Sequence, residues 1–131
     1  MPLSYRVDHV RRIVIVVAHG SLTSDEMIRY QKKVWSSPEV AGYAELVDMT
    51  EVEVIGGASG KQMEALAQLS ASMDVPTKTA KFAIVAPQDE IYGLGRMYEA
   101  YRESTSGTKR VAVFRNQEDA LAWLEEKPTD P

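Results

Sequence analysis

A glycine-rich segment followed by a lysine, Gly56-Gly-Ala-Ser-Gly60-Lys61-Gln62, has the residue types that phosphate-binding loops use. In those loops, glycines let backbone N–H groups wrap the phosphates, the lysine reaches the outer ones, and a following hydroxyl binds magnesium. The spacing departs from that pattern, because Ile55 stands where the first glycine is needed and Gln62 replaces the hydroxyl residue. The segment therefore argues against nucleotide hydrolysis and leaves a weaker anion site at a helix start as an alternative.

Asp48 lies near the predicted end of a strand, where a two-component receiver would carry its phosphoacceptor aspartate. A receiver also needs an acidic pair after its first strand and a lysine after its last parallel strand, to bind magnesium and offset charge. This chain has His19-Gly20 and Phe114-Arg115 at those two places. Asp48 is therefore interpreted as a strand-end residue that is hydrogen-bonded to nearby backbone N–H groups.

The remaining reactive side chains do not form a recognisable catalytic or metal-binding pattern. His9 is predicted in a turn and His19 at the other end of a strand, so the two cannot converge on one metal ion. A grouping of Ser21 and His19 with Asp25 or Asp48 lacks the strained turn that exposes a serine nucleophile. The chain has no cysteine. We therefore predict no catalytic residue, no metal and no cofactor.

The composition is that of one ordinary globular domain. Of 131 residues, 44% are hydrophobic and 26% are charged, and the net charge is -4, which does not favour a nucleic-acid partner. The N-terminal residues lack a signal peptide's apolar region, and no apolar run is long enough to cross a bilayer. We expect a cytoplasmic protein with one domain over residues 1–127 and a disordered tail over residues 128–131.

Hydrophobic periodicity predicts five strands and about four helices. The strands are expected at Ser4–Asp8, Arg12–His19, Glu45–Thr50, Lys81–Ala86 and Arg110–Phe114. The helices are expected at Ser24–Ser36, Lys61–Met73, Asp89–Glu103 and after Asn116. Thr23 and Glu26 have the spacing of a capping box, and Ser59 and Asn116 are suitable N-caps. The order predicts an α/β fold with a mixed five-stranded sheet, mostly parallel, whose first strand is antiparallel.

The third predicted helix carries a candidate contact surface. Tyr98 and Tyr101 are expected to pack on the sheet, whereas Tyr92, Arg96 and Met97 lie partly off that face. Aromatic residues, methionine and arginine are enriched at protein interfaces, so these three are candidates for partner binding.

Two glycines inside the same predicted helix also need an explanation. Gly93 and Gly95 each cost about 1 kcal/mol relative to alanine in a helix. They indicate either a close approach of the backbone to a neighbour, a ligand or a second subunit, or an irregular helix start.

Several segments resemble one known family. Val47-Asp-Met-Thr50, followed by Ala58-Ser-Gly60 at a helix start, resembles the central segment of STAS domains, the class of bacterial anti-sigma factor antagonists. The whole chain is similar to the SpoIIAA-like branch of uncharacterised bacterial proteins. The segments that carry this similarity are Gly20-x-Leu22-Thr23, Ala86-Pro87, Tyr92-Gly-Leu-Gly-Arg-Met-Tyr98 and Val113-Phe114-Arg115. The resemblance implies a SpoIIAA-like (STAS-like) fold.

In the antagonist family, the first serine of an Asp-Ser-Ser-Gly motif is phosphorylated, which switches partner binding. By this resemblance the aspartate falls on Gly57, the phosphorylated serine on Ala58, the second serine on Ser59 and the glycine on Gly60. The phosphoacceptor is therefore replaced by Ala58. Either the switch is lost and Ser59 is only a helix cap, or Ser59 has become the acceptor.

These observations predict a non-catalytic regulatory or binding domain that recognises a protein partner. The candidate binding residues are Asp48, Thr50, Ser59, Gly60, Lys61, Tyr92, Arg96 and Met97. The alternative is a carrier of a small apolar molecule or lipid, using the crevice beyond the strand ends near Thr50, Ser59, Ala86 and Tyr92. A homodimer is a further possibility if Met97 and the neighbouring aromatic residues are exposed.

Overall fold

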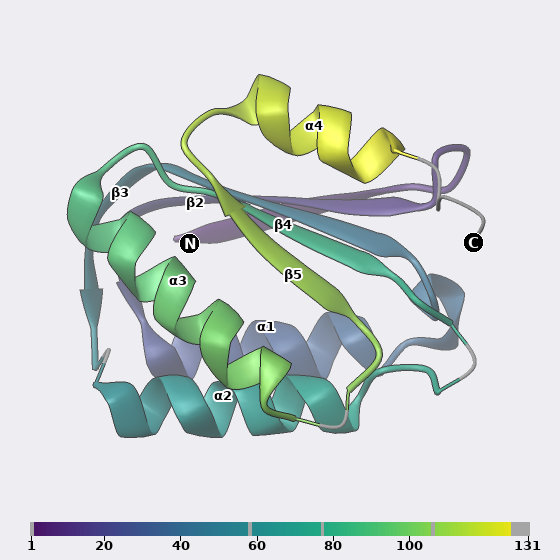
Figure 1. Ribbon diagram of the computed structural model, residues 1–131, viewed down its shortest axis with the longest axis horizontal. Helices are drawn as coiled ribbons and strands as arrows, with labels where there is room; N and C mark the ends of the chain where they lie inside the picture. Colours follow the sequence, from purple (N-terminus) through teal and green to yellow (C-terminus); the bar gives the residue numbers. More distant parts are fainter. Residues whose placement is uncertain (1, 58, 77, 106, 127–131) are drawn as a thin grey trace.

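Five strands form one sheet in the part of the chain that the computed structural model describes, residues 2–57, 59–76, 78–105 and 107–126 (Figure 1). The strands are β1 (Leu3–Asp8), β2 (Ile13–Thr23), β3 (Ala44–Gly56), β4 (Lys81–Val85) and β5 (Arg110–Phe114). Two predictions fall outside the described residues, namely the replacement of the phosphoacceptor by Ala58 and the disordered tail over residues 128–131.

The same described residues form four α-helices and one 3-10 helix. These are α1 (Ser24–Trp35), the 3-10 helix (Pro38–Val40), α2 (Gly60–Ser72), α3 (Asp89–Glu103) and α4 (Gln117–Glu125). At the start of α1, the Thr23 hydroxyl accepts from the Glu26 N–H at 3.2 Å and the Glu26 carboxylate accepts from the Thr23 N–H at 3.0 Å. This reciprocal pair satisfies two N–H groups that the helix itself leaves free. The caps predicted at Thr23, Ser59 and Asn116 are confirmed.

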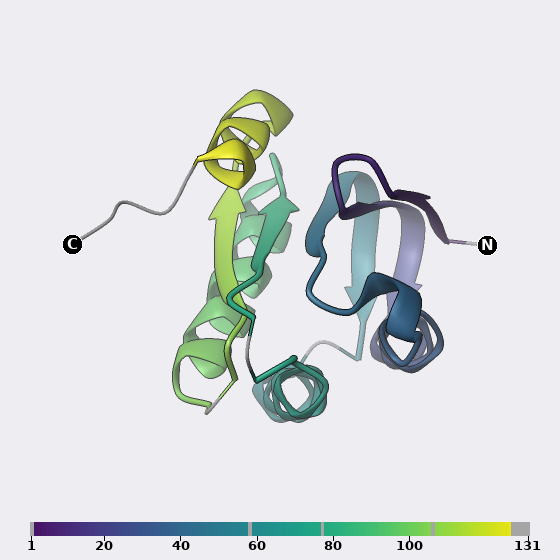
Figure 2. The same ribbon diagram turned by 90° about the vertical axis from the view of Figure 1, so that its right-hand side faces the viewer.

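The strand order in the sheet follows the chain, β1-β2-β3-β4-β5. β1 is antiparallel to β2, and the other neighbours are parallel, as predicted. Because each parallel strand is added on the same side of the previous one, right-handed crossovers place all three connecting helices on one face. Figures 1 and 2 show α1, α2 and α3 on that face and α4 on the other.

β2 and β3 are longer than predicted, and the expected strand ends at His19 and Thr50 are wrong. The two strands stay paired up to Gly56, with two register shifts, one of them next to Gly20 at φ +70°. Glycine adopts this left-handed conformation without steric cost, so the strand continues past the irregularity. β4 pairs with β3 only as far as Asp48. Asp48 therefore lies inside β3, level with the end of β4.

Each face of the sheet carries its own apolar cluster. The larger cluster, between the sheet and α1, α2 and α3, contains buried side chains from every one of these elements, including Val14, Leu22 and Val52. The smaller cluster, under α4, includes Leu46 and Ala120. The two layers follow from the alternation of side chains along each strand.

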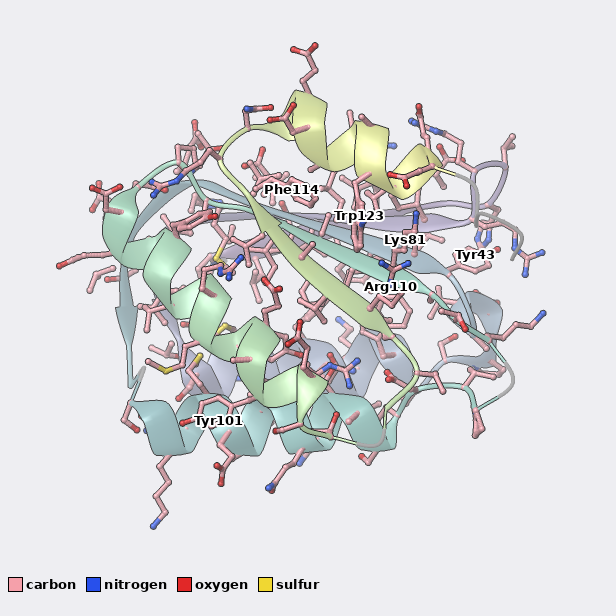
Figure 3. All side chains as sticks on the ribbon, in the orientation of Figure 1. Tyr43, Lys81, Tyr101, Arg110, Phe114 and Trp123 are labelled. Carbon is pink, nitrogen blue, oxygen red and sulfur yellow. The ribbon has the colours of Figure 1, made fainter. Side chains whose placement is uncertain are left out.

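The smaller cluster is closed by α4. Phe114 and Trp123 have ring centres 5.5 Å apart, and both lie between α4 and the sheet (Figure 3). The Lys81 ammonium donates to the carbonyls of Trp123 and Glu126, at 2.8 Å each. These carbonyls lie at the end of α4, where the Trp123 carbonyl also accepts from the Glu126 N–H at 3.2 Å, so Lys81 stabilises the last turn and ties it to β4.

Candidate functional site

A cavity of about 80 Å³ lies between the sheet and the three helices α1, α2 and α3. Its sheet-side wall includes Val16, Val47, Met49, Ile55, Phe82 and Ile84. Its helix-side wall includes Met27, Met63, Leu66, Ile91, Leu94 and Gly95. Three of these residues are methionines from different elements, and methionine side chains adapt to the shape of what they contact. The cavity is therefore a largely apolar space with an adaptable wall.

One end of this cavity carries a buried carboxylate. Glu45 is 2% exposed and lines the cavity. Its Oε2 atom accepts from the Tyr30 hydroxyl at 2.6 Å, and its Oε1 atom accepts from the Lys109 ammonium at 3.4 Å. The Lys109 ammonium also lies 3.6 Å from the centre of the Trp35 ring, whose N–H donates to the Tyr30 hydroxyl at 3.0 Å. A buried charge needs such partners to be tolerated.

Lys109 is positioned by its own backbone. One carboxylate oxygen of Asp74 accepts from the N–H groups of Thr108 and Lys109, at 2.9 Å each. Asp74 in turn is bound by the Arg102 guanidinium at 3.0 Å, and both side chains are almost fully buried. These bonds fix the loop before β5, and the Lys109 side chain extends from this loop to the Glu45 carboxylate.

Two tyrosines, the partly buried Tyr30 and the buried Tyr98, also belong to the polar part of the wall. Burial raises the pKa of Tyr30 well above its usual value, and the neighbouring Glu45 carboxylate raises the pKa further. Burial raises the pKa of Tyr98 to about 12. Both phenols are therefore protonated near neutral pH and serve as neutral O–H groups beside the apolar wall.

Asp48 and Thr50 lie apart from this cavity. Asp48 pairs with Val85, whose side chain belongs to the cluster under α4, so Asp48 faces the α4 side of the sheet. Its carboxylate accepts from the backbone N–H of Thr50 at 2.9 Å and from the Thr50 hydroxyl at 2.5 Å. The predicted hydrogen bond to a nearby backbone N–H is therefore confirmed.

Ser59, Gly60 and Lys61 form the start of α2. The Ser59 hydroxyl accepts from the Gln62 N–H at 3.2 Å and donates to the Gln62 side chain at 2.9 Å. Gly60 lies under Tyr101, because a side chain at Gly60 would come within 3.2 Å of the Tyr101 hydroxyl. Ser59 and Lys61 are exposed. The start of α2 is thus a capped helix end that is open to solvent.

Tyr92, Arg96 and Met97 lie on α3 and do not meet the start of α2 through any described hydrogen bond. Tyr92 is partly buried beneath Arg115, whose guanidinium lies 3.9 Å from the ring centre. Arg96 is exposed and Met97 is 38% exposed. The predicted binding residues therefore lie on separate parts of the surface, on both faces of the sheet.

The polar end of the cavity was not predicted from the sequence. Glu45 stands in the apolar run Ala44-Glu-Leu-Val47, and a charged residue within a buried strand is a signal that was available. Its partners, Tyr30 and Lys109, come from distant parts of the chain, so no local pattern links them. The buried carboxylate could have been found from sequence, and its partners could not.

The residues that the structure describes contain neither a metal-binding cluster nor a membrane-spanning helix. No group of three or more histidine, cysteine, aspartate or glutamate side chains there is arranged to hold a metal ion. None of the helices formed by these residues has the length and apolar character needed to cross a bilayer.

Comparison with known proteins identifies the architecture. No protein-family model and no curated protein matches the sequence. Among solved structures, the chain is similar to an uncharacterized protein from the DUF3478 family with a SpoIIAA-like fold, from Shewanella loihica PV-4, with a TM-score of 0.60. The chain has a SpoIIAA-like fold. The match covers 93% of both chains at 16% sequence identity, so it confirms the predicted SpoIIAA-like fold and concerns the fold alone.

Proposed function

We propose that this SpoIIAA-like domain is a non-catalytic binding domain whose ligand is a small, largely apolar molecule held in the cavity between the sheet and α1, α2 and α3. The observation that carries the proposal is the cavity itself. Protein cores contain few spaces larger than a water molecule, and about 10–15 Å³ is enough to hold one water. A space of about 80 Å³ is several times larger.

The lining agrees with a ligand site. Binding pockets for small molecules are mostly apolar, with a few polar groups that fix orientation. Here, methionine and aliphatic side chains make most of the wall, and Glu45, Tyr30, Gln31 and Tyr98 supply the polar groups. This site replaces the crevice beyond the strand ends as the location of the proposed apolar ligand.

The proposal is tested with methionine methyl groups as reporters. The protein is labelled with ¹³C at these methyl groups and titrated with methyl propyl ether, a small apolar probe. We expect the signals of Met27, Met49 and Met63, which line the cavity, to shift with saturation. The signal of Met97, which is exposed on α3, should stay in place. If no cavity methionine responds to this probe or to the related probes described below, the proposed function is wrong.

A pair of valine substitutions makes the test specific. Val47 lines the cavity, whereas Val14, on the same face of the neighbouring strand, is fully buried and does not line it. Val47→Leu should therefore fill part of the space, weaken ether binding and change stability by less than about 1 kcal/mol. Val14→Leu should overpack the core, cost about 1–3 kcal/mol and leave ether binding in place.

A second proposal is recognition of a protein partner at the start of α2. It is supported by the exposure of Ser59 and Lys61, and by that of Val54, which is 50% exposed near the end of β3. In this proposal a phosphate on Ser59 would add charge at a helix start and alter partner binding. Affinity capture with Ser59→Glu and Ser59→Ala proteins tests it. Identical captured proteins from both variants would remove Ser59 from any switch.

A further inference from the structure

The polar end of the cavity has hydrogen-bond acceptors that the described residues do not use. A carboxylate offers about four acceptor positions, and the Glu45 carboxylate accepts from the Tyr30 hydroxyl and the Lys109 ammonium. Two of the nearby donors are already engaged, because the Tyr30 O–H donates to Glu45 and the Trp35 N–H donates to Tyr30. A group inside the cavity is therefore well placed to supply another donor.

The charge at this end is already balanced. The side chains of Lys109 and Glu45 are 7% and 3% exposed, and they form an ion pair. A cationic ligand would add a second positive charge to one carboxylate, and an anionic ligand would face that carboxylate directly. Each would place an uncompensated charge beside two almost fully buried side chains, which is unfavourable. The site therefore favours an uncharged ligand.

The opposite end of the cavity is apolar. Along β3, the side chains of Glu45, Val47 and Met49 all line the cavity, and the strand advances roughly 13 Å over these residues. Ile55, which comes later in β3, lines the cavity as well, and Ile91 of α3 contributes to the helix-side wall. The cavity is thus polar at the end that contains the Glu45 carboxylate, and its wall becomes apolar with distance from that end along β3.

We propose that the ligand is an uncharged amphiphile whose polar end donates an O–H or N–H hydrogen bond to Glu45, with a compact apolar body against the methionine side chains. This inference rests on the proposed function, because it names the ligand class of the same cavity. The volume limits the apolar body, since an engineered apolar cavity that binds benzene measures about 150 Å³. A longer body requires the methionine side chains to move.

Four probes of nearly equal size test the inference on the unmodified protein. They are n-butanol, its isomer methyl propyl ether, n-butylammonium and propionate. The ether has the same atoms as the alcohol but cannot donate a hydrogen bond. We expect n-butanol to bind about tenfold more tightly than the ether, as judged by shifts of the Met49 and Met63 methyl signals. The two ions should bind more weakly than the ether.

A Glu45→Gln variant then locates the preference. It keeps the size of the side chain and removes the anionic acceptor, so the advantage of n-butanol over the ether should fall to less than about threefold. Glu64→Gln, on the exposed side of α2, is the matched control and should keep the full advantage. Equal binding of the alcohol and the ether to the unmodified protein would overturn this inference while leaving the proposed function intact. Tighter binding of either ion would overturn it as well, even if the Glu45→Gln protein does not fold.

Discussion

Lys109 and Glu45 form an ion pair between the loop before β5 and the start of β3, with the ammonium 3.4 Å from one carboxylate oxygen. Both side chains are nearly buried, and the only other described partner of the ammonium is the face of the Trp35 ring. Desolvation of two charges offsets much of their attraction, so the pair adds little net stability. Removing one member, however, leaves the other charge buried and unpaired.

The first prediction concerns this pair. Lys109→Met should lower the free energy of unfolding by about 3–5 kcal/mol, because the Glu45 carboxylate loses its counter-charge. Urea denaturation followed by circular dichroism measures the change. Lys61→Met is the control, since Lys61 is exposed at the start of α2, and it should change stability by no more than about 0.5 kcal/mol.

The double variant provides the decisive comparison. Glu45→Gln combined with Lys109→Met removes both charges, so its loss of stability should be smaller than the sum of the two single losses by about 1–3 kcal/mol. Simple additivity would mean that the two side chains do not interact energetically, and the ion pair would then have no role in the cavity wall.

The second prediction concerns the open edge of β3. β4 stops pairing with β3 at Asp48, and the Gln88 side-chain amide then donates to the carbonyls of Met49, Thr50 and Val52, at 3.2, 2.7 and 2.9 Å. Gln88→Glu keeps the shape but has no donor and brings negative charge to these carbonyls. It should cost about 1–3 kcal/mol of stability at neutral pH.

Amide hydrogen exchange shows where this loss acts. In the Gln88→Glu protein, exchange should speed up over residues 50–56 of β3 more than over β4, because only the unpaired edge loses its bonds. Gln68→Glu on the exposed side of α2 serves as the control. A uniform increase in exchange rate across the sheet would contradict the prediction that the Gln88 amide specifically stabilises the unpaired edge of β3.

The third prediction separates the two glycines of α3. A side chain at Gly93 would meet no atom within 4 Å, whereas one at Gly95 would lie 3.1 Å from a methyl group of Val113 on β5. Gly93→Ala should therefore stabilise the protein by about 0.5–1 kcal/mol through helix propensity. Gly95→Ala should lose this gain, because α3 must move away from the sheet. Thermal unfolding measures both.

A second substitution, at Val113, tests whether contact with β5 is the reason that alanine is unfavourable at position 95. Combining Gly95→Ala with Val113→Ala removes the contacting methyl groups, so the alanine at position 95 should be less harmful in that background than in the original protein. If Gly95→Ala stabilises as much as Gly93→Ala, close approach to β5 does not explain Gly95.

Local chemistry explains which parts of the fold were predictable. The caps at Thr23, Ser59 and Asn116 depend on side chains within three residues, and the strand order follows from alternating strands and helices. The lengths of β2 and β3 depend on pairing between distant residues across two register shifts, so the local pattern predicts strand ends at His19 and Thr50 that are too early. One of these shifts needs the left-handed conformation of Gly20.

The candidate site was less predictable than the fold for a related reason. A cavity is the space left by side chains from six or more separate segments, and no local pattern reports its volume. The polar residues that were singled out, such as Asp48 and Ser59, are engaged in local hydrogen bonds instead. Glu45 was the one residue of the polar end whose position in an apolar strand set it apart.

The fourth prediction concerns Glu99 on α3. Burial raises the pKa of this carboxyl group, Arg96 opposes the shift, and Glu103 adds to it. One Glu99 carboxylate oxygen is buried without a hydrogen-bond partner among the described residues, and the nearest Arg96 nitrogen lies 3.7 Å from it. The native state therefore binds the Glu99 proton more tightly than the unfolded chain does. The free energy of unfolding therefore falls as the pH rises from the pKa of Glu99 in the unfolded chain through its higher pKa in the native state. Above that pH it stays at the lower value.

Glu99→Gln removes this loss because the amide does not ionise. The variant should be more stable than the original protein at neutral pH, and the difference should shrink to near zero as the pH falls below the ordinary glutamate value of 4.5. Thermal unfolding between acidic and neutral pH measures the difference, with Glu64→Gln on the exposed side of α2 as the control. A stability gain that grows toward acidic pH would have the wrong sign, because it would require the native state to hold the Glu99 proton less tightly than the unfolded chain.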